Sequence, residues 1–167
     1  MGRCDMFFTA VGTKSGKISG ESNDKVFPDQ IELVDWKWGM TAPTAVGGGQ
    51  RIGRTLLHDI KLVKRADRAS TSLANVMHNN EILSTAELSV RKAGGPASAL
   101  AYFIVRLKQA RITSYEVESD IGDEGEHTLT ERLTLTFKNI EIEHKAQSGD
   151  GGGGGGSLFM AEVNPQA

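Results

Sequence analysis

The chain has 167 residues and a mass of 18.0 kDa, the size of one domain that buries about two-thirds of its unfolded surface in a single core. Its net charge of −2 and isoelectric point of about 6.1 give no electrostatic reason to expect nucleic acid or an anionic membrane as a partner. No segment approaches the roughly 20 apolar residues of a membrane span, and the N-terminus lacks the apolar stretch of a signal peptide. We therefore expect one domain over 1–167, made and folded in the cytoplasm.

The first forty residues favour β-strands. Residues 4–11 alternate in polarity, and a turn-rich segment separates them from a shorter stretch over 17–21, which predicts a hairpin. Cys4 has no second cysteine with which to form a disulfide, and its place in the alternation predicts a buried strand residue without chemistry. Residues 30–40 predict the next strand. The side chains expected on one face of that strand are Val34, Trp36 and Trp38.

Residues 55–65 predict a further amphipathic strand. Its apolar face is expected to carry Leu56, Ile60 and Leu62, and its polar face Asp59, Lys61 and Arg65. We expect His58, on the apolar face, to be a core or interface histidine.

One helix is predicted over residues 70–80, and about 11 residues make a helix that is marginal alone and needs the sheet beneath it. Its candidate N-caps are Ser70, Thr71 and Ser72, and its expected buried stripe is Leu73, Val76 and Met77.

The strand predicted over 84–91 alternates, whereas the one over 100–112 is apolar on both faces. In the first, Ala86, Leu88 and Val90 point inward and Glu87, Ser89 and Arg91 outward. The second has an additional apolar face that must be covered, and we expect either the helix or another subunit to cover it. This is the first indication of assembly.

The longest strand signal runs over 129–143, where apolar residues alternate, change phase near Lys138 and Asn139, and alternate again. This pattern predicts one long strand with a β-bulge, a feature that curves a sheet. The fold class is therefore all-β with one helix, as an antiparallel β-barrel with a flanking α-helix.

Three segments are predicted to be irregular: 39–54, 117–127 and the tail from Gln147, which includes a glycine-rich loop over 149–157. The first is long enough to favour a dedicated role or disorder over an idle connection. Residues 158–163 regain apolar character, and we expect either a short terminal strand that docks on the sheet or a disordered tail.

None of the sequence motifs supports catalysis. Residues 48–55 approximate a phosphate-binding loop with Arg54 in place of the lysine, but no buried strand precedes them and no helix follows. The four histidines are widely spaced, and the acidic residues of 116–126 lack the register of a calcium loop. A nucleophile elbow is also missing. We expect no enzyme activity, no cofactor and no metal site.

Charge is distributed unevenly along the chain. Basic residues gather before the helix and in the first long loop, and acidic residues gather in the second loop and near the C-terminal end. One alternative is a solvated surface, and the other is head-to-tail association of a basic patch with an acidic patch on the next subunit. The basic residues are Arg51, Arg54, Lys61, Lys64, Arg65 and Arg68, and the acidic ones include Glu141 and Glu143.

The ordered series of segments resembles the haemolysin co-regulated protein (Hcp) family of type VI secretion over nearly the whole chain. The most specific motifs are GESNDK at 20–25, WGM at 38–40, RKAGG at 91–95 and LTERLTLTF at 129–137. The glycine run at 151–156 and the residues after it match the family only loosely.

The resemblance implies an Hcp-like barrel that assembles as a homohexameric ring, stacks into the tube of the secretion system and carries effector proteins in its lumen. The implied partners are the spike, the sheath and effectors, with no nucleic acid and no membrane insertion, and the implied route is secretion from the cytoplasm through that system. In the family, the loop that corresponds to 39–54 contacts the neighbouring ring.

We expect the subunit and inter-ring contacts at Trp36, Trp38, Thr41, Gln50, Arg51, Arg54, Lys61, Arg65, Glu141 and Glu143. For the two tryptophans, a plain core role is the alternative. Two rival functions remain: a monomeric lipocalin-like barrel that binds a ligand, and an effector with a toxic C-terminal extension. The few residues after His144 are too short for a folded toxin domain.

Overall fold

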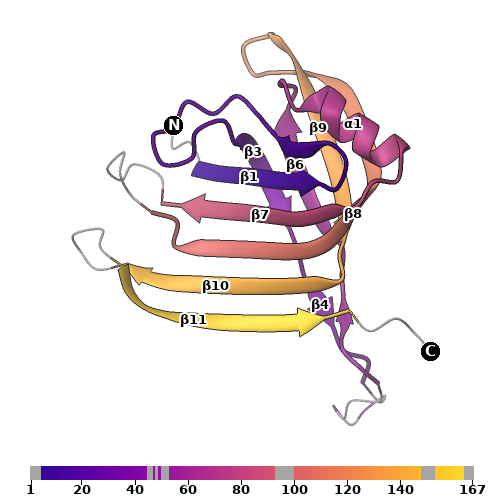
Figure 1. Cartoon of the computed structure of the whole chain (residues 1–167), viewed down its shortest axis with the longest axis vertical. Coiled ribbons are helices and arrows are strands. Elements are labelled where there is room, and N and C mark those ends of the chain that lie inside the picture. Colours follow the sequence, from indigo (N-terminus) through magenta and orange to yellow (C-terminus); the bar gives the residue numbers. More distant parts are fainter. Residues whose placement is uncertain are drawn as a thin grey trace.

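The structure is a computed structural model that describes residues 5–44, 47, 49, 53–92, 100–147 and 153–163. Cys4, Gln50 and Arg51, for which the sequence made predictions, lie outside the described residues. Within these ranges the chain forms eleven strands and one helix (Figure 1). The elements are β1 (Asp5–Gly12), β2 (Gly16–Ile18), β3 (Ile31–Lys37), β4 (Met40–Thr41), β5 (Leu56–Leu57), β6 (Ile60–Arg65), α1 (Ser70–His78), β7 (Leu83–Arg91), β8 (Phe103–Ile121), β9 (His127–Thr136), β10 (Asn139–Gln147) and β11 (Gly153–Glu162).

Six antiparallel strands close a barrel in the order β8, β7, β1, β3, β6, β9, because β9 returns to pair with β8. β1, β7 and the first half of β8 cross the front of Figure 1, and β3, β6 and β9 run steeply behind them. A continuous hydrophobic cluster from both layers and from α1 forms the core. The predicted antiparallel barrel with a flanking helix is confirmed, and β2 completes the predicted N-terminal hairpin with β1.

β8 is the element that closes the barrel. Its first part, from Phe103, pairs with β7 on one side and β10 on the other, and its last part, as far as Ile121, pairs with β9. The predicted loop over 117–127 is therefore wrong over most of its length. Here β8 and β9 form a hairpin that projects beyond the barrel, and Gly125 at φ +82° makes its turn.

The predicted strand over 129–143 is two strands, β9 and β10, which separate at Phe137 and Lys138. The change of phase is real, since Leu133 and Leu135, at odd positions, are buried before the break and Ile140, at an even position, is buried after it. The chain leaves the rear layer of the barrel there and joins β8 in the front layer, with the Lys138 N–H donating to the Lys108 carbonyl at 3.1 Å. One strand therefore ends here and another begins, where the sequence predicted a bulge within a single strand.

β10 and β11 extend the front layer past the barrel. β11 begins at Gly153, so the loop expected over 149–157 is wrong from that residue onward, and the terminal strand is confirmed. The glycines pair in register with β10, Gly156 lying opposite Lys145, because β10 supplies the backbone partners that side chains do not. Within the described residues β11 pairs on one side only, with β10, and Leu158 and Met160 are 58% and 65% exposed.

Part of the second apolar face of β8, at Ile104, is covered by a loop of the same chain, which the sequence did not predict. Ile104 packs with Phe7, Phe27 and Ala101 in a separate small cluster, and Phe27 belongs to the loop that precedes β3. The ion pairs from Arg91 to Asp5 and Asp24 hold this loop down, and the Arg91 guanidinium lies 5.5 Å from both the Phe7 and Phe27 rings. Arg91 and Ser89, predicted to point outward, are therefore buried.

Two strand predictions in the rear layer need correction. In β3 the pairing register shifts between Leu33 and Asp35, so that Leu33 is buried while Val34 is 45% exposed. The single strand predicted over 55–65 is broken at residues 58–59 into β5, which pairs only with β4, and β6. Leu56 is consequently 51% exposed instead of lying in the core.

The helix begins at Ser70, as predicted, but Ala69 is its N-cap and makes no side-chain capping bond. Ser70 Oγ instead accepts a hydrogen bond from the Asp67 N–H at 2.9 Å. Leu73 and Val76 are buried and Met77 is partly buried against the core. No helix in the described part of the chain has the length and apolar content that crossing a membrane requires.

Candidate functional site

The ribbon formed by β4 and β5 leaves one end of the barrel and is fixed at its root. The Trp38 indole Nε1–H donates to the His58 carbonyl at 2.9 Å, and the His58 N–H donates to the Gly39 carbonyl at 3.0 Å. Thr41 Oγ1 lies 3.1 Å from His58 Nε2. Trp38 and Thr41, both predicted contact residues, thus meet through a histidine that is exposed, because the break before β6 removes it from the expected apolar face.

The two tryptophans are half-buried and belong to the margin of the core. The Trp36 ring lies 5.8 Å from that of Phe103, and the Trp38 ring lies 6.3 Å from that of Phe159 on β11. Trp36 also borders an apolar hollow of 450 Å³ at the open end of the two layers. The other residues that line it are Met6, Val34, Asp35, Val90, Tyr102 and Phe103. Each tryptophan therefore packs on the core and faces a surface.

The predicted basic cluster before the helix does not form one patch. Lys64 is 1% exposed and inside the barrel, and Arg68 donates to the Gly20 carbonyl at 2.7 Å. Arg65 donates to Thr128 at 3.2 Å and also to Thr130. Of these four residues, Lys61 alone makes no such contact with the described part of the chain, since alternation along β6 places it on the exposed face.

Lys64 is held in a buried polar network under the helix. It forms ion pairs with Glu131 and, at 2.8 Å, with Asp67, while the Tyr115 hydroxyl donates to Glu131 at 2.7 Å. Burial raises the pKa of Glu131, but the hydrogen bonds from Lys64, Ser70 and Tyr115 outweigh it, so that the pKa lies below its ordinary value. Sequence reasoning missed this network, because in the pattern of residues Lys64 and Glu131 are indistinguishable from surface charges.

Glu141 and Glu143 lie on the outer face of the front layer beside Arg106. Its guanidinium donates to Glu141 at 2.9 Å and to Glu143 at 2.8 Å, and lies 3.3 Å from Glu87 on β7. The hydrogen bond from Arg106 holds the pKa of Glu143 below its ordinary value. These glutamates are therefore partners within the subunit, and the structure does not bring them near Lys61 or Arg65.

Arg54 is exposed on the segment that leads into β5, and Thr41 lies in β4. Both belong to the projecting ribbon. The sequence missed Lys37, which is directly opposite Lys61 in the pairing of β3 with β6. A cross-strand pair of this kind cannot be found until the pairing register is known.

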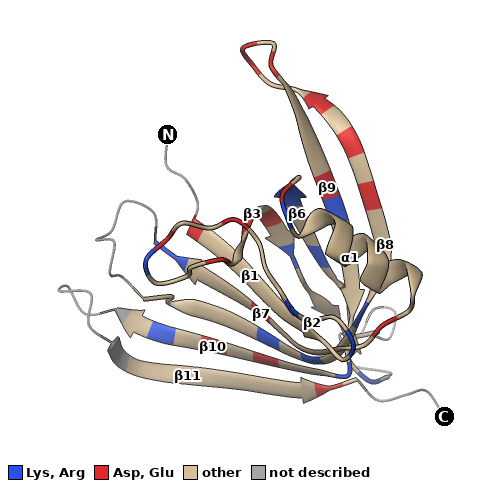
Figure 2. Ribbon diagram, turned by 45° about the horizontal axis from the view of Figure 1, so that its top comes forward, with Lys and Arg blue, Asp and Glu red and all other residues tan. Residues whose placement is uncertain are grey.

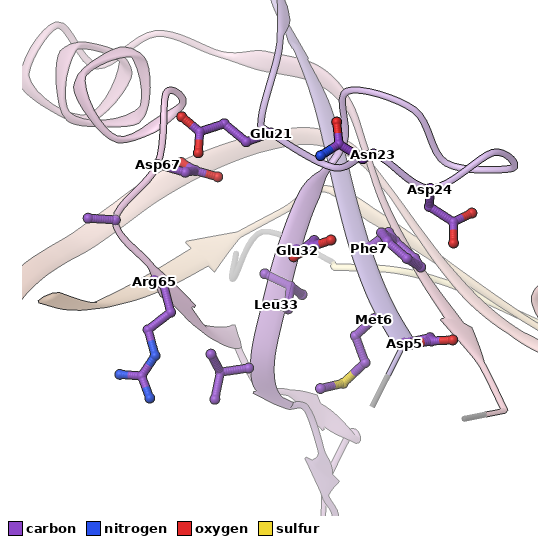
Figure 3. A pocket seen from close by; sticks show the side chains of 12 residues that line it. Asp5, Met6, Phe7, Glu21, Asn23, Asp24, Glu32, Leu33, Arg65 and Asp67 are labelled. Carbon is purple, nitrogen blue, oxygen red and sulfur yellow. The ribbon is translucent and has the colours of Figure 1, made fainter. Parts of the chain in front are cut away.

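A hollow of 740 Å³ opens between the start of β1, β3 and the loop that covers the front layer (Figure 3). Its lining is rich in carboxylates, including Glu21, Asp24, Glu32 and Asp67, with Arg65 at one side. Among the described residues no group of three or more histidine, cysteine or acidic side chains has the arrangement of a metal site. Two of these carboxylates, Asp24 and Asp67, form ion pairs with Arg91 and Lys64 respectively.

The geometry defines an all-β barrel protein whose distinctive features are a projecting ribbon, a projecting hairpin and a free sheet edge. A family model described as "Type VI secretion system effector, Hcp" matches residues 8–144. The chain belongs to the Hcp family of type VI secretion system proteins and is homologous to the Hcp tube subunit.

The chain is 32% identical over 149 residues to Protein hcp1 of Pseudomonas aeruginosa strain PAO1, and the match covers 88% of this chain and 86% of that protein. Two solved structures share the fold. "Crystal structure of Hcp protein" has a TM-score of 0.83 at 18% identity and covers 98% of this chain and 100% of that one. "Structure of a type six secretion system protein" has a TM-score of 0.81 at 22% identity and covers 96% of each.

Proposed function

We propose that this protein is a non-enzymatic structural subunit of the type VI secretion tube, which forms homohexameric rings that stack end to end and hold effector proteins in the lumen. The observation that carries the proposal is the β4–β5 ribbon. Trp38, Thr41 and His58 fix its root, as expected of a segment that must contact another molecule at a defined angle. Family membership supplies the class of that molecule, a further ring of the same subunit.

Lateral contacts between subunits find support in the free edge of β11. This edge presents backbone groups and the exposed Leu158 and Met160, a combination that isolated soluble proteins usually cover or blunt. Trp36 and Trp38, next to this layer, remain proposed subunit contacts. Glu141 and Glu143 already form ion pairs with Arg106 of the same subunit, so we expect them to contribute less to the binding energy between subunits.

Membership of the Hcp family supports the proposals for the other binding partners and for the export route. We propose that the protein is made in the cytoplasm, binds the spike, the sheath and effectors, and is exported by the machine that it helps to build. Thr41, Gln50, Arg51 and Arg54 are the proposed inter-ring contacts. Lys61 and Arg65 remain proposed contacts near the two ends of β6, and Arg65 forms an ion pair with Asp120 of the β8–β9 hairpin at 4.0 Å.

The test is the solution mass of the purified protein by light scattering over a concentration series, followed by negative-stain imaging. A species of about six subunits with a central hole is the expected result. A strict monomer at every concentration overturns the ring proposal. In that case binding of a lipophilic dye would support the lipocalin-like alternative, although side chains fill the barrel core.

A further inference from the structure

Pairing within the subunit removes most of the charges that the sequence offered for association. Lys64, Arg65 and Arg68 lie in ion pairs with Glu131, Asp120 and Asp29 respectively. In the front layer Arg106 pairs with Glu87, Glu141 and Glu143. Two groups of charges that form no ion pair within the described residues lie at opposite ends of the molecule.

At one end, Lys37 and Lys61 are directly opposite each other on β3 and β6, next to the root of the β4–β5 ribbon. Like charges directly opposite across two strands repel. Within the described residues neither lysine, nor Arg54 on the ribbon, forms an ion pair. We call Lys37, Lys61 and Arg54 the basic end. Asp35 and Glu116 line the same hollow as Lys37 and Lys61, although within the described residues neither carboxylate forms an ion pair with them. Two lysines held side by side favour an anionic partner from outside the subunit.

At the other end is the β8–β9 hairpin over residues 116–129, with Asp123, Glu124 and Glu126 in its turn (Figure 2, at the top). Within the described part of the chain no lysine or arginine forms an ion pair with these three carboxylates. The β8–β9 register pairs residues 117, 119 and 121 with 131, 129 and 127, so these six side chains share one face of the hairpin, and three of them are apolar. Its apolar side chains are Val117, Ile121 and Leu129, which are 53%, 69% and 52% exposed.

The two ends are complementary in apolar surface as well as in charge. The β4–β5 ribbon carries Met40 and Leu56, which are 48% and 51% exposed. The hairpin and the ribbon project from opposite ends of the long axis of the molecule (Figure 1). Copies placed in the same orientation along that axis bring the acidic, apolar hairpin of one against the basic, apolar ribbon of the next. A contact of this heterologous kind has no closed end and continues into a stack.

We propose that the β8–β9 hairpin of one copy docks on the basic end and β4–β5 ribbon of the copy in the next ring. This inference rests on the proposed tube function and names the surface that receives the ribbon. Asp123 and Glu124 neutralise the Lys37 and Lys61 pair, and the apolar strip of the hairpin covers Met40 and Leu56. The charges also set polarity, since two like ends repel and rings stack head to tail only.

Two charge-reversed variants test the contact. Lys37→Glu with Lys61→Glu reverses the basic end, and Asp123→Lys with Glu124→Lys reverses the hairpin. Each variant alone presents like charges at every ring junction, so we expect rings of unchanged mass and loss of stacks in negative stain. Mixing the two sets of preformed rings in equal amounts presents opposite charges at every junction, and stacks should return with alternating rings. Lys17→Glu with Lys108→Glu is the matched control, which should stack as the unmodified protein does.

The outcomes separate this inference from the function on which it rests. If the unmodified protein forms no rings, the proposed function fails. If rings form but never stack, if both reversed variants stack alone, or if their mixture does not stack, the docking contact is wrong while the ring proposal survives. Should reversal disturb ring mass, Lys37→Gln with Lys61→Gln replaces it, and unmodified rings are imaged at about 1 M salt, where the screening length falls to roughly 3 Å. If neither the glutamine substitutions nor the high salt concentration weakens stacking, the inference is overturned.

Discussion

Lys64 and Glu131 form an ion pair inside the barrel, and each side chain is about 1% exposed. The pair joins β6 to β9 directly below α1. Asp67 and Ser70 bind the Lys64 ammonium from the segment that begins the helix, and Tyr115 donates to the second oxygen of Glu131. Four elements therefore share one polar network, and the helix has a specific attachment in addition to its apolar stripe.

Glu131→Gln is expected to lower the free energy of unfolding by about 3 kcal/mol, because it removes the principal anion from a buried ammonium and leaves Asp67 alone to compensate it. Tyr115→Phe is the matched control. It keeps the ion pair and removes one hydrogen bond, for an expected loss of about 1 kcal/mol. Urea titration measures both values. Equal losses for the two variants would show that the hydrogen bond, and not the buried charge, dominates the network.

Stability should fall in acid. The pKa of Asp24 lies below its ordinary value chiefly because of the hydrogen bond from Arg91, and that of Glu131 is also lowered. A carboxyl group with a lower pKa in the folded state contributes stability above its unfolded pKa, about 4 for both residue types, and loses it as the pH falls through the folded pKa. The free energy of unfolding, measured from pH 7 down to pH 3, should be flat at first and then decrease. Asp24→Asn should lower the plateau and flatten the acid limb; an unchanged acid limb would assign the decrease to other groups.

The alternation of apolar residues was enough to predict the barrel and most of its strands, because a period of two fixes which side chains enter the core. The sequence prediction failed where pairing with a neighbouring strand determined the local structure. The β8–β9 hairpin at 117–127 looked like an acidic loop, since carboxylates outnumber large apolar side chains there and both Val117 and Ile121 are exposed. Likewise, Gly153 to Gly156 have no strand propensity of their own and are held by β10.

The candidate site could be predicted only in outline. The length of the 39–54 segment indicated a dedicated role, but the hydrogen bond from Trp38 to His58 spans a break in the strand that alternation could not reveal. Charge counting overestimated the basic patch, because burial of Lys64 and pairing of Arg65 depend on neighbours distant in sequence. For the same reason Lys37, whose importance comes from facing Lys61, was overlooked.

A substitution at Gly20 tests how closely the loop before β3 packs on that strand, and Gly155 in β11 supplies the control. A Cβ on Gly20 would lie 2.6 Å from the Gln30 carbonyl oxygen and 2.7 Å from the Ile31 Cα, both backbone atoms that cannot move without shifting β3. We expect Gly20→Ala to cost about 3 kcal/mol in unfolding free energy, the upper range for a single substitution. Gly155→Ala, where the new methyl group meets nothing within 4 Å, should change stability by less than about 0.5 kcal/mol. Similar thermal midpoints for the two would contradict the close approach at Gly20.

Trp38→Phe tests whether the root of the ribbon fixes its direction. The variant keeps an aromatic ring near Phe159 but loses the hydrogen bond to the His58 carbonyl, a loss of about 1 kcal/mol that falls on the ribbon and not on the barrel. We expect unchanged ring mass, faster tryptic cleavage after Arg54, and fewer stacked rings, because a loose ribbon must be ordered again at each junction. Trp36→Phe is the matched control, since it removes the same indole from the neighbouring tryptophan, whose ring packs on Phe103, without touching the ribbon. If both variants accelerate cleavage equally, the effect comes from the core margin, and the hydrogen bond at Trp38 has no special part in holding the ribbon.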